Sequence, residues 1–383
     1  MLTPRSTLTR RVLAALDAVP PRIPVLVGGS GAGKTTVVQL IRDRIGRGAT
    51  EHIDVERTAT TPERFFRSVA SASPFPVSDQ IPAGARQAFD ATLAFLTRAK
   101  TGSGEAAAFV LDEFLELRTF ESFPGLRRVL HEFVEGLAAS GNRFVLTSRY
   151  TARTARLLRD HSARFEVIPM AALTAEDTLD MLGLAAARGT EDADYLARTV
   201  QALADGRPIY VRAIADELAI AREHGGPEAS DPITALASVL SSDGRLSREC
   251  SFCYELRLHR ARGYGALKAI LEILAAEEAL TLTEISVRLQ RTPGSTKDYL
   301  SWLEDVDLVT ARHKRYSFAD PLLRVWVRLH CRPSPPTDDD LAREIHRYAL
   351  PRLPPHEPVR PEAQAPAEPA FAMAGSSGII EID

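Results

Sequence analysis

Residues 28–35 read Gly-Gly-Ser-Gly-Ala-Gly-Lys-Thr, and they follow the apolar run Ile-Pro-Val-Leu-Val at 23–27. A strand-like run, a G-x-x-x-x-G-K-T loop and then the apolar helical spacing of residues 36–41 are typical of a phosphate-binding loop. Glycine has no Cβ, so its backbone amide can turn toward a phosphate, and the N-terminus of the following helix favours negative charge. The stretch therefore predicts a nucleoside triphosphate site. A chance match in a glycine-rich turn is disfavoured by the strand before the loop and the helix after it.

The loop motif assigns roles to individual residues. Lys34 is expected to reach the β and γ phosphates, and Thr35 is expected to supply its hydroxyl to Mg²⁺. The residues predicted to contact the nucleotide or its metal here are Gly28, Gly29, Ser30, Gly31, Ala32, Gly33, Lys34, Thr35 and Thr36.

A second motif ends another apolar run. Residues 106–114 read Ala-Ala-Ala-Phe-Val-Leu-Asp-Glu-Phe, which places Asp112 and Glu113 at the carboxyl end of a strand. Taken alone, a solvated acidic strand end is the better interpretation. Paired with the phosphate loop, the run predicts a Walker B element, in which Asp112 holds Mg²⁺ directly or through water and Glu113 activates the attacking water. Two adjacent acids favour hydrolysis over binding alone.

A third strand-like run, Arg-Phe-Val-Leu-Thr-Ser-Arg at 143–149, ends in polar residues at the same expected edge. Thr147, Ser148 or Arg149 are candidates to sense the γ-phosphate. Arg149 is the sharpest choice, because a guanidinium can bind a phosphate through two hydrogen bonds and respond to its loss. The alternative for Arg149 is an ordinary surface arginine.

Composition limits the class of protein. A chain of 383 residues can hold two or three domains with a large core, and three cysteines fit a reducing compartment. No stretch approaches about eighteen apolar residues, and the arginine-containing N-terminus lacks the apolar segment of a signal peptide. We therefore expect a cytoplasmic protein that does not engage a membrane. A net charge of −3 and a pI near 6.3 give no overall attraction to nucleic acid, although a local basic patch remains open.

Strand-like runs near 23–28, 51–55, 107–111, 143–148 and 164–168 alternate with helical patterns, including those near 62–72 and 84–100. This alternation predicts an α/β fold with a parallel sheet wrapped by helices, over residues 1–170. From about 171 to 260 the pattern is helical, and Thr174 followed by Asp177 predicts a capped helix start. We assign this stretch to a helical lid.

Residues 205–211 of that stretch read Asp-Gly-Arg-Pro-Ile-Tyr-Val. Gly206 is expected to end one helix and Pro208 to start the next, where a missing amide hydrogen costs nothing. A plain connector between helices is one interpretation. The functional alternative places Pro208 against the base and ribose of the nucleotide, and Arg207 or Arg212 near its phosphates.

These four motifs, in this order, resemble the STAND class of signal-transduction ATPases. Within that class the chain is similar to the predominantly archaeal ATPase families, relatives of the origin-recognition initiator ATPases, over roughly residues 20–330. The resemblance implies an additional-strand P-loop NTPase fold of the AAA+ and STAND type with strand order 5-1-4-3-2. It also implies ATP as the nucleotide, ATP hydrolysis and a switch whose conformation, oligomerisation or partner binding follows the nucleotide. The start departs from the family, because residues 7–13 stand where many relatives carry a Phe-x-x-Arg-x-x-Glu motif that contacts adenine.

The resemblance extends to residues 261–332, where helical patterns at 263–271, 283–289 and 292–303 precede two strand-like runs at 306–309 and 315–318. This arrangement looks like a winged helix-turn-helix. Residues 333–383 are rich in proline and predict a largely disordered tail with a short helix near 338–349. The apolar and acidic end at 377–383 would suit a strand that adds to a partner's sheet, or an inert terminus.

Two partner classes stay open for the winged helix. A basic wing and the start of the recognition helix could contact DNA, through Ser295, Thr296, Lys297, Tyr299, Arg312, His313, Lys314 and Arg315. Nearby acids oppose this, namely Asp298, Glu304, Asp305 and Asp307. The resemblance offers the alternative that this domain packs back on the ATPase and keeps it closed. A homo-oligomer or a protein partner, a DNA-loading ATPase and a non-hydrolysing nucleotide binder are thus competing expectations.

Two smaller groups of residues carry weaker predictions. Cys250 and Cys253 have zinc-ligand spacing, but no second pair completes a tetrahedral site, so we expect cysteines that face a core. Arg153, Arg156 and Arg159 follow the third strand, and they are either solvated or able to complete a neighbouring subunit's site.

Overall fold

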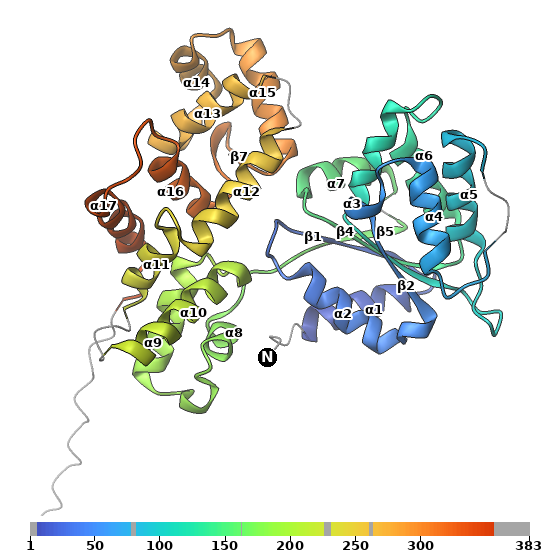
Figure 1. Ribbon diagram of the computed structural model, residues 1–383, viewed down its shortest axis with the longest axis horizontal. Helices are drawn as coiled ribbons and strands as arrows, with labels where there is room; N and C mark the ends of the chain where they lie inside the picture. The colour runs from blue at the N-terminus through green and yellow to red at the C-terminus, as the bar shows by residue number, and fades with distance from the viewer. Residues whose placement is uncertain (1–5, 78–81, 162, 226–230, 260–262, 356–383) are drawn as a thin grey trace, which may run out of the picture.

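The structure is a computed structural model that describes residues 6–77, 82–161, 163–225, 231–259 and 263–355. The chain forms two bodies, joined by the segment after the last strand of the first one (Figure 1). We call residues 6–169 the α/β body and residues 175–355 the helical body.

Five parallel strands form the sheet of the α/β body. They are β1 (Ile23–Val27), β2 (Thr50–Asp54), β3 (Ala108–Asp112), β4 (Arg143–Ser148) and β5 (Phe165–Pro169). Their order is β2-β3-β4-β1-β5, which is the predicted order 5-1-4-3-2 counted from the other edge. The central strands are apolar on both sides, because successive side chains of a strand enter opposite faces and both faces of this sheet are covered.

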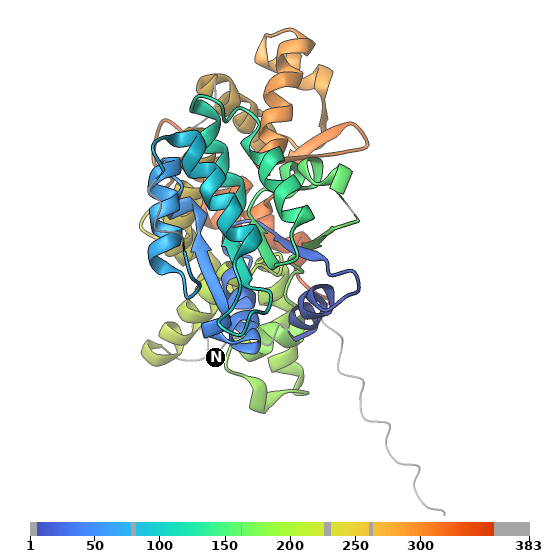
Figure 2. The same ribbon diagram turned by 90° about the vertical axis from the view of Figure 1, so that its right-hand side faces the viewer.

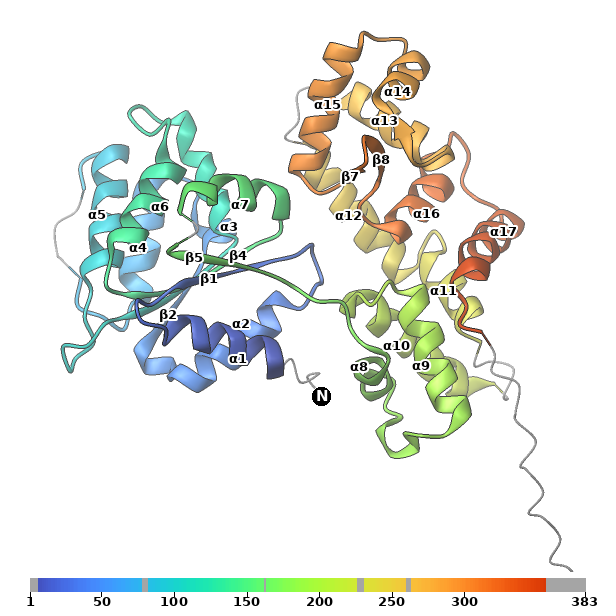
Figure 3. The same cartoon turned by 180° about the vertical axis from the view of Figure 1, so that it is seen from behind.

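Helices cover the two faces in separate layers (Figure 3). One layer contains α1 (Ser6–Leu16) and α2 (Lys34–Ile45), packed on the face of the sheet that carries Leu26 and Val110. The opposite layer contains α4 (Pro62–Ala72), α5 (Ala85–Arg98) and α6 (Val129–Ala139), packed on Phe109 and Phe144. The predicted helices near 62–72 and 84–100 are therefore confirmed. Shorter helical segments follow the carboxyl ends of β2, β3 and β4. They are α3 (Val55–Thr58), the 3-10 segment η2 (Phe114–Ser122) and α7 (Thr151–Leu157).

The helical body begins with α8 (Ala175–Met181), α9 (Glu191–Leu203), α10 (Pro208–His224), α11 (Pro232–Leu240) and α12 (Arg245–His259). Thr174 and Asp177 cap the start of α8 reciprocally, as the sequence predicts. Gly206 has a φ of 61°, and Pro208 occupies the first turn of α10, so the predicted break between α9 and α10 is also confirmed.

The remaining part of the helical body adds α13 (Tyr264–Ala276), α14 (Leu282–Leu289), α15 (Pro293–Asp305), α16 (Pro321–His330) and α17 (Asp338–Ala349). The strand β6 (Leu280–Thr281), between α13 and α14, joins β7 (Val309–Arg312) and β8 (Arg315–Phe318), between α15 and α16, in a three-stranded antiparallel sheet of order β6-β8-β7. The three predicted helices and the second predicted strand are confirmed. The strand predicted at 306–309 begins only at Val309, because residues 306–308 form the turn that follows α15.

Helix α16 connects two hydrophobic clusters of the helical body. Leu322 and Leu329 belong to the cluster with α10 and α11, whereas Leu323 and Trp326 belong to the cluster with α13 and α15. The first cluster also contains Ile345 of α17. The predicted short helix near 338–349 is therefore confirmed, but it is packed into the helical body. Residues 356–383, including the strand-like end at 377–383, lie outside the described residues.

The two bodies touch where α15 meets α7, and Figure 2 shows these orange and green segments next to each other. Asp307, two residues past α15, accepts hydrogen bonds from the backbone amides of Thr151 and Ala152 at the start of α7. Arg156 of α7 forms an ion pair of 2.6 Å with Asp305. Across the described ranges, none of the helices is long and apolar enough to cross a membrane.

Candidate nucleotide site

The phosphate loop connects the carboxyl end of β1 with the N-terminus of α2. Gly31 and Gly33 have φ values of 71° and 86°, in the left-handed region that favours glycine. Lys34 turns back over the loop, and its Nζ donates to the Gly28 carbonyl at 2.6 Å and to the Gly29 carbonyl at 3.3 Å. The loop therefore has the concave backbone and the buried ammonium that the phosphates of a nucleotide require.

The tip of the loop is covered by the helical body. A Cβ placed on Gly31 would lie 2.5 Å from Cγ2 of Ile209, the residue after Pro208. Ser30 Oγ donates to a carboxylate oxygen of Glu249 on α12 at 3.5 Å. The motif around Pro208 thus lies against the phosphate loop, as the functional alternative for this motif requires.

Thr147 connects the two acids of β3. Its hydroxyl donates to Asp112 Oδ1, and the hydroxyl oxygen, Thr147 Oγ1, accepts a hydrogen bond of 3.0 Å from the backbone amide of Glu113. Glu113 has a φ of 56° and a ψ of 48°, a left-handed conformation that costs a residue with a Cβ about 1 kcal/mol or more. This backbone turn directs the acid that follows the strand toward β1 and β4, where the phosphate loop and Arg149 lie.

Both carboxylate oxygens of Glu113 are occupied. Oε1 lies 3.2 Å from Lys34 Nζ, and Oε2 accepts the Arg149 backbone amide at 2.8 Å and lies 3.3 Å from Arg149 Nε. Glu113 is only 9 % exposed, so these contacts exchange little with water. The two cations that the sequence assigns to phosphate are in this structure bound to the candidate general base.

Arg149 is held between two carboxylates, Glu113 and Glu56 of α3. Burial alone lowers the pKa of an arginine, but the two neighbouring carboxylates outweigh burial and raise the pKa of Arg149 above its ordinary value. Its side chain is 11 % exposed. The surface-arginine alternative is therefore wrong, because Arg149 is a fixed, permanently charged group beside Glu113.

The residues assigned to Mg²⁺ fit an oxygen-ligated cation by type. Asp112 shares only Oδ1 with Thr147, and its Oδ2 lies 4.0 Å from His52 Nε2 on β2. Burial lowers the pKa of His52 in spite of Asp112, so the imidazole is neutral at pH 7. Thr35 is exposed at the first turn of α2. A hydroxyl on the helix after β1 and a carboxylate at the end of β3 are groups that would supply the protein share of a Mg²⁺ shell, with phosphate and water as the other ligands.

The sequence offers two arginines of the predicted lid for the phosphates, and only one of them lies near the loop. Arg207 lies beside Gly29 and forms an ion pair with Asp320 at 3.0 Å, whereas Arg212 is exposed on α10. Burial lowers the pKa of Arg207 and Asp320 raises it, with a net rise. Asp320 also accepts the Tyr210 hydroxyl at 2.6 Å. The loop-facing arginine is thus connected to the start of α16.

The structure also brings in residues for which the sequence offers weak signals or none. Arg257 of α12 has a guanidinium beside Gly29 and donates to the Asp307 carbonyl at 3.0 Å, and nothing in its helical surroundings singles it out. Asp320 precedes a proline, which marks a helix cap but does not indicate a partner in α10. Glu56 follows β2 without any motif.

Three further groups that the sequence singles out can be placed. Cys250 and Cys253 lie close to the phosphate loop, where they line a small pocket together with Ser30 and Arg207. Cys250 is buried and Cys253 is partly buried on α12, and the described part of the chain holds no cluster of three His, Cys, Asp or Glu side chains able to bind a metal. Thr296 is fully buried and donates to the Thr292 carbonyl, so its assignment to a DNA-facing surface is wrong. Arg156 is paired with Asp305, and Arg159 is exposed.

The sheet order, the phosphate loop and the acids at the end of β3 define the P-loop ATPase fold with an additional strand. No family model and no curated protein matches the sequence. Among solved structures, the chain is similar to a Walker-type ATPase of Pyrococcus abyssi, with 16 % identity, a TM-score of 0.60 and coverage of 85 % of this chain and 96 % of that one.

Two more distant similarities follow. The Orc1 protein of Aeropyrum pernix, solved in complex with DNA, has 18 % identity and a TM-score of 0.45 over 92 % of this chain and 94 % of that one. Cdc6p from Pyrobaculum aerophilum has 16 % identity and a TM-score of 0.43 over 92 % and 96 %. At 16 % identity, the similarity to the Pyrococcus abyssi ATPase supports the fold alone.

Proposed function

We propose that this protein is an ATP-hydrolysing molecular switch of the STAND type, in which the nucleotide controls the contact between its two bodies. One observation carries the proposal. The candidate sensor Arg149 binds Glu113, and residues 151 and 152, which follow it closely, donate their amides to Asp307 of the helical body. A change at the γ-phosphate position would therefore reach the contact between the bodies within three residues.

Competition for two cations would produce the switch. The phosphates of ATP carry more negative charge than one carboxylate, so they would attract Lys34 and Arg149 away from Glu113. Glu113 would then have free oxygens to accept a proton from the attacking water. Mg²⁺, held by Thr35 and Asp112, would supply charge neutralisation at the phosphates. After loss of the γ-phosphate, Arg149 and Glu113 would pair again as they do in this structure.

The nucleotide can shift the population of the two arrangements only if it binds one of them better. Movement of Arg149 toward a phosphate would pull on residues 150–152 and weaken their hydrogen bonds to Asp307. An ATP state in which α15 leaves α7 would expose surfaces of both bodies to a second copy of the chain or to a protein partner. We assign residues 171–260 to a lid over the nucleotide, with Pro208 near the base, and residues 261–332 to a winged helix that acts as the latch.

The test compares wild type with Glu113→Gln, and uses Glu105→Gln, an exposed acid of the same body, as the control. ATP turnover and ATP binding are measured while light scattering follows the molecular mass, with and without duplex DNA. We expect turnover in wild type and in the control, and ATP binding without turnover in Glu113→Gln, which should accumulate in the ATP-bound arrangement. Unchanged turnover in Glu113→Gln would refute its role as base. Binding without turnover in wild type would instead identify a nucleotide binder that does not hydrolyse.

A second candidate function, DNA loading, is favoured by one observation. Asp305 and Asp307, which should weaken a DNA-binding surface, face the α/β body, whereas Arg312 to Arg315 are exposed at the turn between β7 and β8. His313 and Lys314 have φ values of 50° and 63°, which makes this a tight turn with basic side chains at its tip. Turnover or assembly that requires duplex DNA, and that is lost with salt and in Lys314→Glu, would replace the switch by this alternative.

A further inference from the structure

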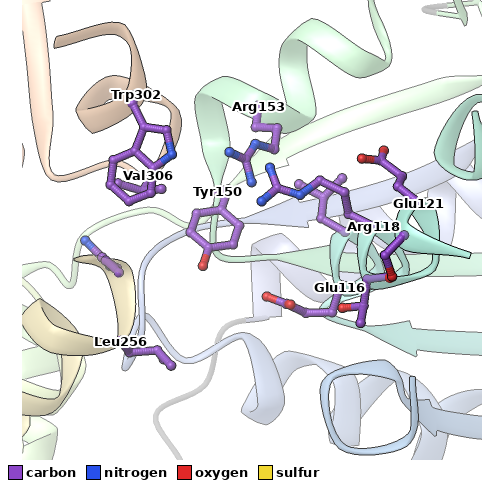
Figure 4. Close-up of a pocket in the computed structure, with 12 residues that line it drawn as sticks. Glu116, Arg118, Glu121, Tyr150, Arg153, Leu256, Trp302 and Val306 are labelled. Carbon is purple, nitrogen blue, oxygen red and sulfur yellow. The ribbon is translucent and has the colours of Figure 1, made fainter. Parts of the chain in front are cut away.

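A cavity of about 540 Å³ lies between the two bodies, next to the nucleotide site, and of the residues placed at the phosphate loop it shares only Arg257. Its walls come from η2 directly after Glu113, from the start of α7 directly after Arg149, and from α12 and α15 of the helical body (Figure 4). This volume lies within the usual range of small-molecule sites, about 300–1,000 Å³.

Positive charge without a carboxylate partner gathers in this cavity. Within the described residues, Arg118 and Arg153 form no ion pair, and Figure 4 shows their guanidinium groups side by side. Arg257, only 9 % exposed, also lines the cavity and donates to the backbone carbonyl of Asp307. Burial, and then the adjacent Arg118, lower the pKa of Arg153. Arginines kept close together and desolvated gain most from an anion that binds both.

The other walls add a requirement for a ring. Tyr150 from the α/β body and Trp302 from the helical body line the same cavity, and Arg153 lies 5.4 Å from the centre of the Tyr150 ring. Aromatic and guanidinium planes favour flat ligands. Two acids, Glu116 and Glu121, are also present, so the cavity is not uniformly positive. Their negative charge would disfavour a ligand with several phosphates and would be compatible with a ligand that carries one phosphate.

We propose that this cavity is a second ligand site, separate from the phosphate loop, which binds a small aromatic monophosphate of mononucleotide size, with the phosphate on Arg118 and Arg153 and the ring against Tyr150 and Trp302. A ligand there touches both bodies and lies behind Glu113 and Arg149. Its binding stabilises the contact between α7 and α15, so the ligand acts as an effector of nucleotide binding at the phosphate loop.

The two tryptophans of the chain allow a direct test on the full-length protein. Trp302 lines the cavity, whereas Trp326 is buried and donates to Ser247 at 3.0 Å. Protein labelled with 5-fluorotryptophan should give two fluorine resonances, and Trp302→Phe assigns them. AMP is the probe, with inorganic phosphate and adenosine as its two halves. We expect AMP to shift the Trp302 resonance in wild type and in Lys34→Ala, with weaker binding of either half.

Matched arginine variants decide the proposal. Arg118→Ala and Arg153→Ala should each weaken AMP binding about ten-fold or more, whereas Arg159→Ala, an exposed arginine just past α7, should leave it unchanged. Circular dichroism checks that each variant is folded, and Arg118→Lys provides a second, milder variant. The proposal is overturned if folded wild type shows no Trp302 shift with AMP, if the shift vanishes in Lys34→Ala, or if adenosine alone reproduces it. A shift caused by a DNA oligonucleotide but not by AMP would overturn it in favour of nucleic acid.

Discussion

Single side chains at the ends of β1, β3 and β4 determine what this site can do. Glu113 forms ion pairs with Lys34 and Arg149, so in this structure the candidate base and the candidate phosphate ligands neutralise one another. The geometry depends on Thr147, whose hydroxyl contacts both Asp112 and the Glu113 amide. A residue described by sequence only as one possible phosphate sensor therefore has a positioning role.

Gly31 gives a residue-scale prediction. Gly31→Ala should weaken nucleotide binding and destabilise the fold, because its φ of 71° is strained for alanine and its Cβ would lie 2.5 Å from Ile209. Gly48→Ala is the control, since a Cβ there has no neighbour within 4 Å. Calorimetric titration with ATP measures the effect. Cβ of Ile209 also lies 2.6 Å from the added Cβ, so Ile209→Gly, which removes the whole side chain, should partly rescue Gly31→Ala if the close approach matters. Absence of rescue would leave backbone strain as the main cause.

Glu51 on β2 gives a prediction about pH. It is 2 % exposed with neither oxygen in hydrogen-bond geometry within the described chain, and burial raises its pKa from 4.5 to about 7, against a small opposing effect of Ser73. Below pH 4.5 the carboxyl is neutral in both states. Between about pH 4.5 and 7 the unfolded chain releases a proton that the folded chain keeps, so the free energy of unfolding falls, and above pH 7 the loss is complete.

Glu51→Gln removes this titration. We expect it to be close to neutral at pH 5 and to stabilise the protein by up to about 3 kcal/mol at pH 8.5. Urea unfolding of both proteins at the two pH values measures the difference. Equal stability of the two proteins at pH 8.5 would show that Glu51 ionises in the fold without a penalty.

At the scale of elements, α17 shows how a proline-rich end contributes to a core. Its Thr337 and Asp340 cap the helix reciprocally, and Ile345 and Tyr348 are buried against α11 and α16. Arg328 of α16 pairs with Glu344 at 2.7 Å. The helix is amphipathic, so its apolar side needs a partner, which α11 and α16 provide.

Ile345→Ala should therefore lower the free energy of unfolding of the helical body by about 2–5 kcal/mol. Arg343→Ala, on the exposed side of the same helix, should change it by less than about 1 kcal/mol, since its pair with Asp340 is solvated. Chemical denaturation followed by circular dichroism compares them. A loss of similar size in both variants would mean that α17 contributes through helix propensity and not through packing.

At the scale of the whole molecule, the contact between α7 and α15 is where local chemistry can become a large movement. Asp307 accepts two amides of α7 and is partly buried, and burial raises its pKa against the opposing effect of those amides. The exposed ion pair between Arg156 and Asp305 adds little, about 0.2–1 kcal/mol. Asp307 is thus the stronger of these two contacts.

Asp307→Ala should separate the bodies, because two amides lose their acceptor and α7 loses the cap that Tyr150 does not provide. We expect a larger radius of gyration by small-angle scattering and faster nucleotide exchange. Arg156→Ala is the control and should show neither change to a similar degree. A compact Asp307→Ala protein would remove Asp307 from the latch and would leave the cavity-lining residues to hold the bodies together.

The sequence by itself determined the strand runs, the phosphate loop and the acids after β3, because these follow from local hydrophobic pattern and from a motif whose residues are contiguous. The strand order came from the resemblance to a known class of ATPases. The sequence also determined the breaks at Thr174, Gly206 and Pro208, because caps and turns depend on neighbours along the chain. Only the tertiary structure decided that Arg149 binds Glu56 and Glu113, that Arg257 reaches the loop, and that Asp307 faces α7.

The physical reason is the distance along the sequence between the residues that interact. A cap or a strand pattern involves residues a few positions apart, whereas these contacts join residues 36 to 228 positions apart. The free energy of a charged side chain also depends on which distant element excludes water from it. Asp307 illustrates the difference. In the sequence it is one of several acids beside a basic wing, and in the folded chain it is the acceptor that connects the helical body to the start of α7.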